Sequence, residues 1–63
     1  MTTDEKIELE YTNGFEQGML KRLEIASLME LEQERESTER TYYRTPSGPV
    51  RAWFAGYLDG LTA

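Results

Sequence analysis

Apolar residues recur every four positions in the first third of the chain. Four residues have this spacing: Ile7, Tyr11, Phe15 and Met19. Such a period places their side chains on one face of a helix. Thr2 and Glu5 occupy the two positions of a capping box just before this segment. The pattern therefore predicts a helix that starts close to Thr2.

Residues 6–11 also permit a second interpretation. Ile7, Leu9 and Tyr11 alternate with polar residues, as in a half-buried strand, and residues 12–14 form a turn signal. A strand here would need a partner strand, for which only residues 40–45 qualify. We favour the helix and keep a short N-terminal strand before a long helix as the alternative.

Residues 19–31 are the most helix-prone part of the sequence, and their apolar side chains do not form one stripe. At about 100° per residue they are spread over most of the helix circumference. The apolar residues concerned are Met19, Leu20, Leu23, Ile25, Ala26, Leu28, Met29 and Leu31. An apolar surface of this width needs cover from more than one direction. Because one short partner helix is too small for this, we expect a second copy of the chain to contribute.

The clearest break in the sequence is the segment Thr45-Pro46-Ser47-Gly48-Pro49. Apolar residues then follow at helical spacing: Val50, Trp53, Phe54, Tyr57, Leu58 and Leu61. The expected fold class is all-α, with a long helix, a Pro/Gly loop and a short C-terminal helix that form a helical hairpin in a single domain, residues 1–63. Two such hairpins would give a four-helix arrangement as a dimer.

One short pattern occurs twice, at residues 14–19 and 56–61. Each copy reads glycine, aromatic, two variable residues, glycine, apolar. A glycine inside a helix costs about 0.5–1 kcal/mol relative to alanine, so close approach of another backbone is the best reason for keeping two in each element. The pattern predicts helices that cross closely, within one chain or across a dimer axis. The expected self-association residues are Gly14, Phe15, Gly18, Leu20, Leu23, Leu31, Trp53, Gly56, Tyr57 and Gly60.

Residues 53–60, which read WFAGYLDG, resemble the core helix of LAGLIDADG homing endonucleases. In that family two such helices pack through their small residues, and an acid near the helix end binds the catalytic metal. Asp59 stands at the matching position, whereas Gln17 stands where the first block would carry the acid. The family's DNA-binding sheet has no counterpart after Gly60. The resemblance therefore implies the close crossing of two helices and not the nuclease activity.

Composition excludes several classes of protein. The chain has no histidine and no cysteine, which removes nucleophilic triads, disulfides and the usual transition-metal sites. Its net charge of −5 disfavours general binding to phosphates. The N-terminal residues lack the features of a signal peptide, and no stretch reaches the ~20 apolar residues of a membrane span. We expect a cytoplasmic protein that is not an enzyme and that holds no cofactor and no metal.

Two charged segments are candidate binding surfaces for an unidentified protein partner. The basic one combines arginine with tyrosine, both enriched at binding hot spots, ahead of a helix N-terminus that favours anions. Its candidate residues are Arg40, Tyr42, Tyr43, Arg44 and Arg51. The acidic candidates are Glu30, Glu32 and Glu34. The plainer interpretation is an ordinary interhelical loop beside a solvated acidic face that serves solubility.

We expect a non-enzymatic protein–protein interaction module that forms a homodimer. Its size, acidity and lack of motifs are similar in style to short accessory proteins of phages and mobile elements, which act as inhibitors or regulators of a host macromolecule. Dense carboxylates on a helix can imitate a DNA backbone in such a role. The alternative is a small nucleic-acid-binding module that uses Arg40, Arg44 and Arg51.

Overall fold

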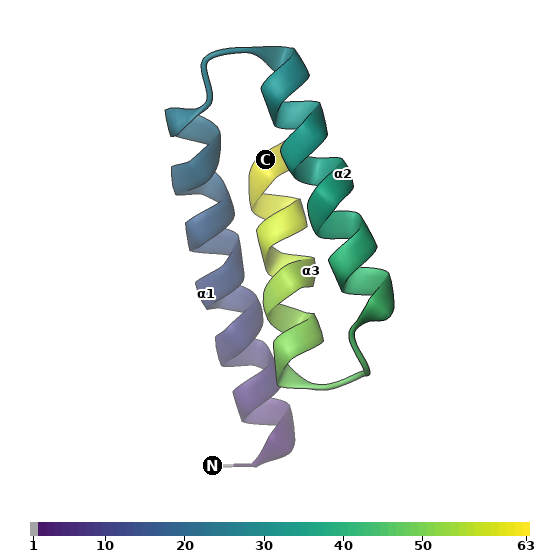
Figure 1. Cartoon of the computed structure of the whole chain (residues 1–63). Coiled ribbons are helices and arrows are strands. Elements are labelled where there is room, and N and C mark those ends of the chain that lie inside the picture. Colours follow the sequence, from purple (N-terminus) through teal and green to yellow (C-terminus); the bar gives the residue numbers. More distant parts are fainter. Residues whose placement is uncertain (1) are drawn as a thin grey trace.

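The computed structural model describes residues 2–63 and contains three helices. They are α1 (Thr3–Glu24), α2 (Leu28–Arg44) and α3 (Pro49–Thr62) (Figure 1). The prediction of an all-α fold is therefore confirmed. The strand alternative is wrong, because residues 6–11 lie inside α1. The helix is favoured over the strand there because the side-chain hydroxyl of Thr2 accepts a hydrogen bond from the Glu5 amide, as in a capping box.

The expected long helix is interrupted at residues 25–27, so the chain forms two helices where one was predicted. Ile25 leaves α1 with extended backbone angles, and Ser27, also extended, begins α2. The Ser27 hydroxyl accepts a hydrogen bond from the Glu30 amide at 3.2 Å. Ser27-Leu28-Met29-Glu30 is thus a second capping motif, and this local bond outweighs the high helix propensity around it.

The second break falls where the prolines predicted it. Thr45 precedes Pro46 and ends α2 with extended backbone angles, as the proline ring requires of its neighbour. Pro49 starts α3, where its missing amide hydrogen is not needed. Between them Gly48 has φ +144° and ψ −168°, a combination open to glycine alone. Three residues, Thr45, Gly48 and Pro49, therefore specify the backbone of this corner.

The helices form an elongated layer with α3 in the middle. α1 and α2 lie on opposite sides of α3, and α1 and α3 run in the same direction, with α2 antiparallel to both (Figure 1). α3 packs more extensively on α1 than on α2, and α1 hardly touches α2. The Cα trace measures 39 × 21 × 12 Å. The third dimension is close to the diameter of one helix, so the chain supplies one layer and no second one.

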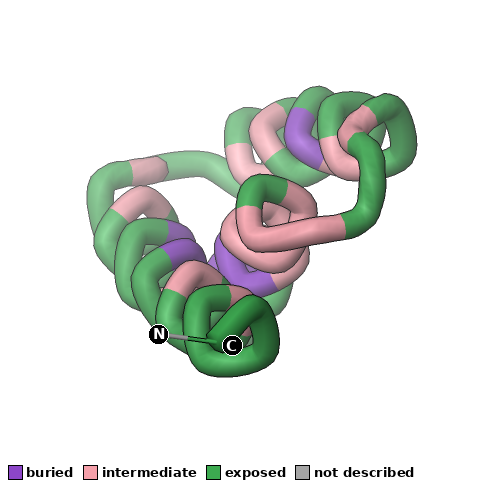
Figure 2. The backbone as a smooth tube through the Cα atoms, turned by 90° about the horizontal axis from the view of Figure 1, so that it is seen from below, coloured by how far each residue is buried: buried purple, intermediate pink, exposed green. Residues whose placement is uncertain are grey.

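The buried positions lie mainly between α1 and α3. Figure 2 shows buried segments of these two helices facing one another, with most of α2 exposed. Large apolar side chains contribute little to this core: only Tyr57 and Leu61 are buried among the described residues. The four glycines of the repeated pattern make up most of the remaining buried positions. The chain is thus held together by close backbone contact more than by a large apolar core.

Candidate interaction surfaces

The two glycine pairs form the contact between α1 and α3. A Cβ atom on Gly14 or Gly18 would overlap the backbone carbonyl of Trp53 or Tyr57, respectively. A Cβ atom on Gly56 would lie 2.9 Å from the Phe15 amide nitrogen and would overlap the Tyr11 carbonyl oxygen. The crossing therefore occurs within one chain, the first of the two alternatives open to the sequence.

The same contact accounts for several of the expected self-association residues. Gly14, Gly18, Gly56 and Gly60 are buried inside the chain, and Tyr57 is 9% exposed. Phe15, Leu31 and Trp53 are half-buried. In contrast, Leu20 and Leu23 of α1 are exposed. Only these two present most of their surface for contact with another molecule.

Two tyrosine–carboxylate hydrogen bonds join α3 to its neighbours. The hydroxyl of Tyr57 donates to Glu34 Oε1 on α2 at 2.8 Å. The hydroxyl of Tyr11 on α1 donates to Asp59 Oδ2 on α3. Glu34 was a candidate for partner binding, and Asp59 matched the acid of the endonuclease helix. In the structure each of these carboxylates accepts a hydrogen bond that connects two helices.

These hydrogen bonds also raise the pKa values of the two tyrosines. Burial, followed by the hydrogen bond to Glu34 and its negative charge, raises the pKa of Tyr57 far above its ordinary value. The hydrogen bond to Asp59 comes first among the causes that raise the pKa of Tyr11. Both tyrosines therefore stay neutral hydrogen-bond donors well into the alkaline range.

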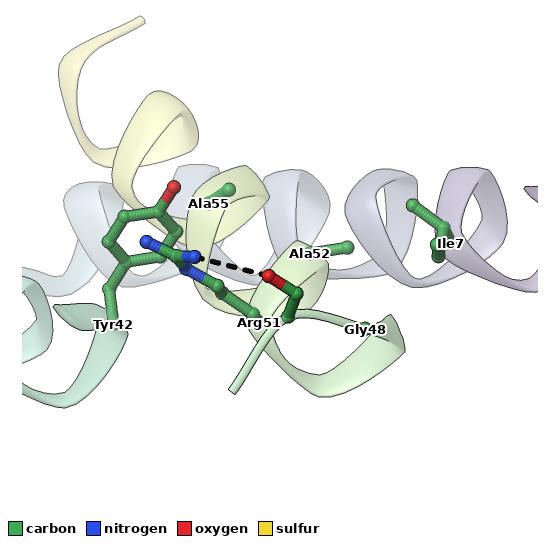
Figure 3. A pocket seen from close by; sticks show the side chains of 7 residues that line it. Ile7, Tyr42, Gly48, Arg51, Ala52 and Ala55 are labelled. Atoms are coloured by element: carbon green, nitrogen blue, oxygen red, sulfur yellow. Dashed lines mark hydrogen bonds between the residues drawn. The ribbon is translucent and has the colours of Figure 1, made fainter. Parts of the chain in front are cut away.

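The basic candidates meet at the corner between α2 and α3, and Arg51 organises them. Its guanidinium carbon lies 4.4 Å from the centre of the Tyr42 ring, within range of a cation–π interaction. Its Nη1 atom lies 3.5 Å from the Ser47 hydroxyl (Figure 3). Tyr42 in turn packs edge-on against Tyr43. Within residues 2–63 the Nε atom of Arg51 is buried and has no hydrogen-bond partner.

A small hollow opens beside Arg51, between Tyr42, Gly48 and the small residues of α3 (Figure 3). Its volume is about 190 Å³. Sites for small molecules are typically about 300–1,000 Å³ and contain several converging polar groups. Here the arginine is already engaged by Tyr42 and Ser47. The hollow is therefore smaller than a typical site for a small molecule.

The other candidates at this corner differ in their surroundings. Arg40 forms an ion pair with Glu36 one turn earlier, at 3.0 Å, with both side chains 66% exposed. Tyr43 is 75% exposed and Val50 is 62% exposed, and Arg44 between them in sequence is also exposed. We call Tyr42, Tyr43, Arg44, Val50 and Arg51 the Tyr–Arg corner. It presents an aromatic, a cationic and an aliphatic side chain to solvent.

The acidic candidates do not gather on one face. Glu30 and Glu32 are two residues apart on α2, so their side chains point about 200° apart around the helix. Glu34 is occupied by Tyr57. Glu32 lines a hollow that also contains Arg22 and Arg35. The acid-rich segment therefore surrounds α2 and does not form a flat anionic surface.

A group of exposed apolar residues lies where α1 ends and α2 begins. Only two of its members were among the candidate residues. We call it the apolar end. It consists of Met19, Leu20, Leu23, Leu28 and Met29, exposed by 46%, 53%, 83%, 80% and 71%. Leu20 and Leu23 were expected to take part in self-association; the other three were not. The signal that could have found them is the width of the apolar surface over residues 19–31.

Across residues 2–63 no three carboxylates gather in a way that could hold a metal ion. No helix in this range has both the length and the apolar character needed to cross a bilayer. Comparison of the chain with protein-family models, curated proteins and solved structures found no match.

Proposed function

We propose that this chain is a non-enzymatic protein–protein interaction module that acts as a homodimer and binds a different protein through the Tyr–Arg corner. The observation that carries the proposal is the exposure of Tyr43, at 75%, next to the exposed Arg44 at the end of α2. Tyrosine and arginine are the residue types that dominate binding energy at protein interfaces. Exposed at neighbouring positions, they form a small hot spot without an occupant in the chain.

The packing at the corner supports a binding role because it limits the motion of the tyrosines. Tyr42 is held between Arg51 and Tyr43, at 4.4 Å and 5.2 Å from its ring centre. Ordering a flexible side chain on binding costs about 0.5–1.5 kcal/mol. Tyr43 is already positioned by its neighbour, so a partner loses less of its binding energy to that cost.

The position of the corner also fits a module with two contact regions. The Tyr–Arg corner lies at the turn between α2 and α3, and the apolar end lies at the turn between α1 and α2, at the other end of α2 (Figure 1). One region can therefore bind a partner while the other pairs with a second copy. With three helices in each chain, such a dimer contains six helices and not the four expected from the sequence.

The consequence of binding in this proposal is inhibition or regulation of the partner, in the style of small phage-type accessory proteins. We also place the protein in the cytoplasm, because a chain without cysteine takes no advantage of an oxidising compartment. The arginines of the corner favour a partner with an acidic surface at the contact.

The test is affinity capture with immobilised wild-type protein and two double variants, using a lysate of the native host and identifying bound proteins by mass. We expect a protein that wild type retains and that the Y43A/R44A variant loses. The matched control is the E30K/Q33K variant, which changes two exposed residues of α2 away from the corner and should retain it. Loss in the control with retention by Y43A/R44A would move the binding surface to the acidic residues and refute the corner.

The nucleic-acid alternative receives less support from the geometry. Of its three arginines, Arg40 is paired with Glu36 and Arg51 is stacked on Tyr42. Phosphate binding draws on several uncommitted cations and gives a steep salt dependence. A salt-sensitive shift of DNA that Arg44→Ala abolishes would favour this alternative over the protein partner.

A further inference from the structure

The strongest unexplained feature is the surface that the fold leaves uncovered. The chain exposes 4,620 Å². A folded monomer of its mass, 7.3 kDa, exposes roughly 4,200 Å² by the general scaling of surface with size. The excess of roughly 400 Å² is about half of what one partner buries in an interface of standard size, about 800 Å². The chain therefore exposes more surface than a folded monomer of its size, and an interface could bury the excess.

Much of the exposed apolar surface is concentrated at the apolar end. Of the nine large hydrophobic residues that are exposed within residues 2–63, five lie within residues 19–29. Four of these residues, Met19, Leu20, Leu23 and Leu28, line three adjoining hollows that share side chains. The hollow on the outer side of α1 and the one between α1 and α3 share Met19 and Leu23. The hollow between α1 and α3 in turn shares Arg22 with a third hollow, which lies between α1, α2 and α3. The surface is thus continuous around this end of the molecule.

The charges at the rim of this surface distinguish a second copy from a foreign partner. The hollows contain Glu16, Glu32, Arg22 and Arg35, acids and bases in equal number. A rim of one sign would favour a partner of the opposite sign. A rim with both signs can match itself when a twofold axis brings two copies together, since such an interface uses the same patch on both subunits.

We propose that the apolar end is an isologous dimer interface, in which residues 19–29 of one copy pack against residues 19–29 of a second. This inference rests on the self-association in the proposed function and names its surface. It also explains why the single layer of helices is stable: the second copy supplies the cover that α3 does not give to the outer side of α1 and the start of α2. Small domains with few buried apolar residues commonly use oligomerisation in this way.

The first test is sedimentation velocity over a wide range of concentration. We expect wild type to sediment as a dimer, and the L23E/L28E variant to sediment as a monomer with its dissociation constant raised by about 100-fold or more, because the substitutions place charges in the contact. The control is L9E/V50E, which alters two exposed apolar residues outside residues 19–29 and should remain dimeric. Circular dichroism monitors helix content in each variant.

A second measurement covers the case in which L23E/L28E fails to fold. The chain has no cysteine, so L23C and L9C each carry one thiol that leaves the core unchanged. Under mild oxidation L23C should form a disulfide-linked dimer rapidly at low concentration, whereas L9C should not.

The outcomes distinguish the interface at residues 19–29 from self-association in general. A monomeric wild type would overturn both the interface and the homodimer of the proposed function. The interface alone would be overturned if L9E/V50E disrupted the dimer, L23E/L28E left it intact, and L23C showed no preferential linkage. Self-association would then have to use another surface.

Discussion

Gly18 and Gly60 face one another across the contact between α1 and α3. A Cβ atom placed on either residue would lie 3.0 Å from the Cα atom of the other, tighter than nine in ten such contacts in proteins. The relationship is reciprocal and involves backbone on both sides, so neither helix can yield by turning a side chain. These two residues, together with Gly14 and Gly56, therefore set the separation of the two helices.

The first prediction concerns Gly18→Ala. Alanine favours a helix by about 1 kcal/mol over glycine, so the substitution would stabilise a helix with open space around it. Here the new methyl group overlaps the Tyr57 carbonyl, and we expect a net loss of up to about 2 kcal/mol in the free energy of unfolding. A domain of this size has only about 3–9 kcal/mol in total. Urea unfolding provides the measurement.

The matched control is Asn13→Ala, an exposed position of the same helix. It should change the free energy of unfolding by no more than about 0.5 kcal/mol. If Gly18→Ala proved as stable as this control, the close approach of α1 and α3 would be refuted.

The second prediction concerns Tyr57 at alkaline pH. Its pKa is raised in the folded protein, so the neutral hydroxyl is favoured there and the contribution to stability is complete below the unfolded value of about 10. As the pH rises above 10, the unfolded chain loses its proton first and wild type should lose stability. Tyr57→Phe should lower stability at pH 7 by about 1.5 kcal/mol, through loss of the bond to Glu34, and should show a weaker decline above pH 10.

Thermal unfolding between pH 7 and 11.5 measures this dependence. Tyr11→Phe is the comparison, because Tyr11 also donates to a carboxylate but is 38% exposed. We expect a smaller effect at every pH. Equal alkaline slopes for wild type and Tyr57→Phe would contradict the assignment.

The third prediction concerns the start of α2. Ser27→Ala removes the acceptor of the Glu30 amide hydrogen and should cost about 1 kcal/mol. Ser27→Asp keeps an acceptor and adds a favourable charge at a helix N-terminus, so it should equal or exceed wild type in stability. Chemical unfolding of the three proteins gives the order. Should Ser27→Ala match Ser27→Asp, the hydroxyl is not the reason that the helix breaks at residues 25–27.

The fourth prediction concerns Gly48. No atom outside its chain neighbours lies within 4 Å of a Cβ atom built there, so a larger residue meets no steric obstacle. Its φ of +144° nevertheless excludes other residues, and Gly48→Ala should cost about 1–3 kcal/mol through backbone strain alone. Gly48→Asn should be no better, since asparagine tolerates the left-handed helical region but not this one. A variant of either kind with wild-type stability would show that the turn can change shape freely.

The elements with strong local signals were predictable from the sequence. The prolines located the corner at residues 45–49, and helical spacing located α3. The paired glycines indicated closely crossing helices, and the structure places that crossing between α1 and α3. In each case the determining chemistry lies within a few neighbouring residues.

The interruption at Ser27 was missed because the surrounding residues favour a helix and a single side-chain hydrogen bond decides otherwise. The parallel arrangement of α1 and α3 depends on where α2 packs, which no local pattern encodes. The Tyr–Arg corner was predictable as a basic, aromatic segment. The stacking of Arg51 on Tyr42 depends on the angle between α2 and α3, so the sequence could not reveal it.

The shared direction of α1 and α3 has a kinetic consequence. Gly18 and Gly60 are 42 positions apart, whereas antiparallel neighbours joined by a short turn meet through nearby residues. Chain entropy opposes so distant an encounter until α2 and its turns have formed. Assembly should therefore begin with α2 and α3, and docking of the first helix should limit the rate, at speeds below those of small bundles whose contacts are local.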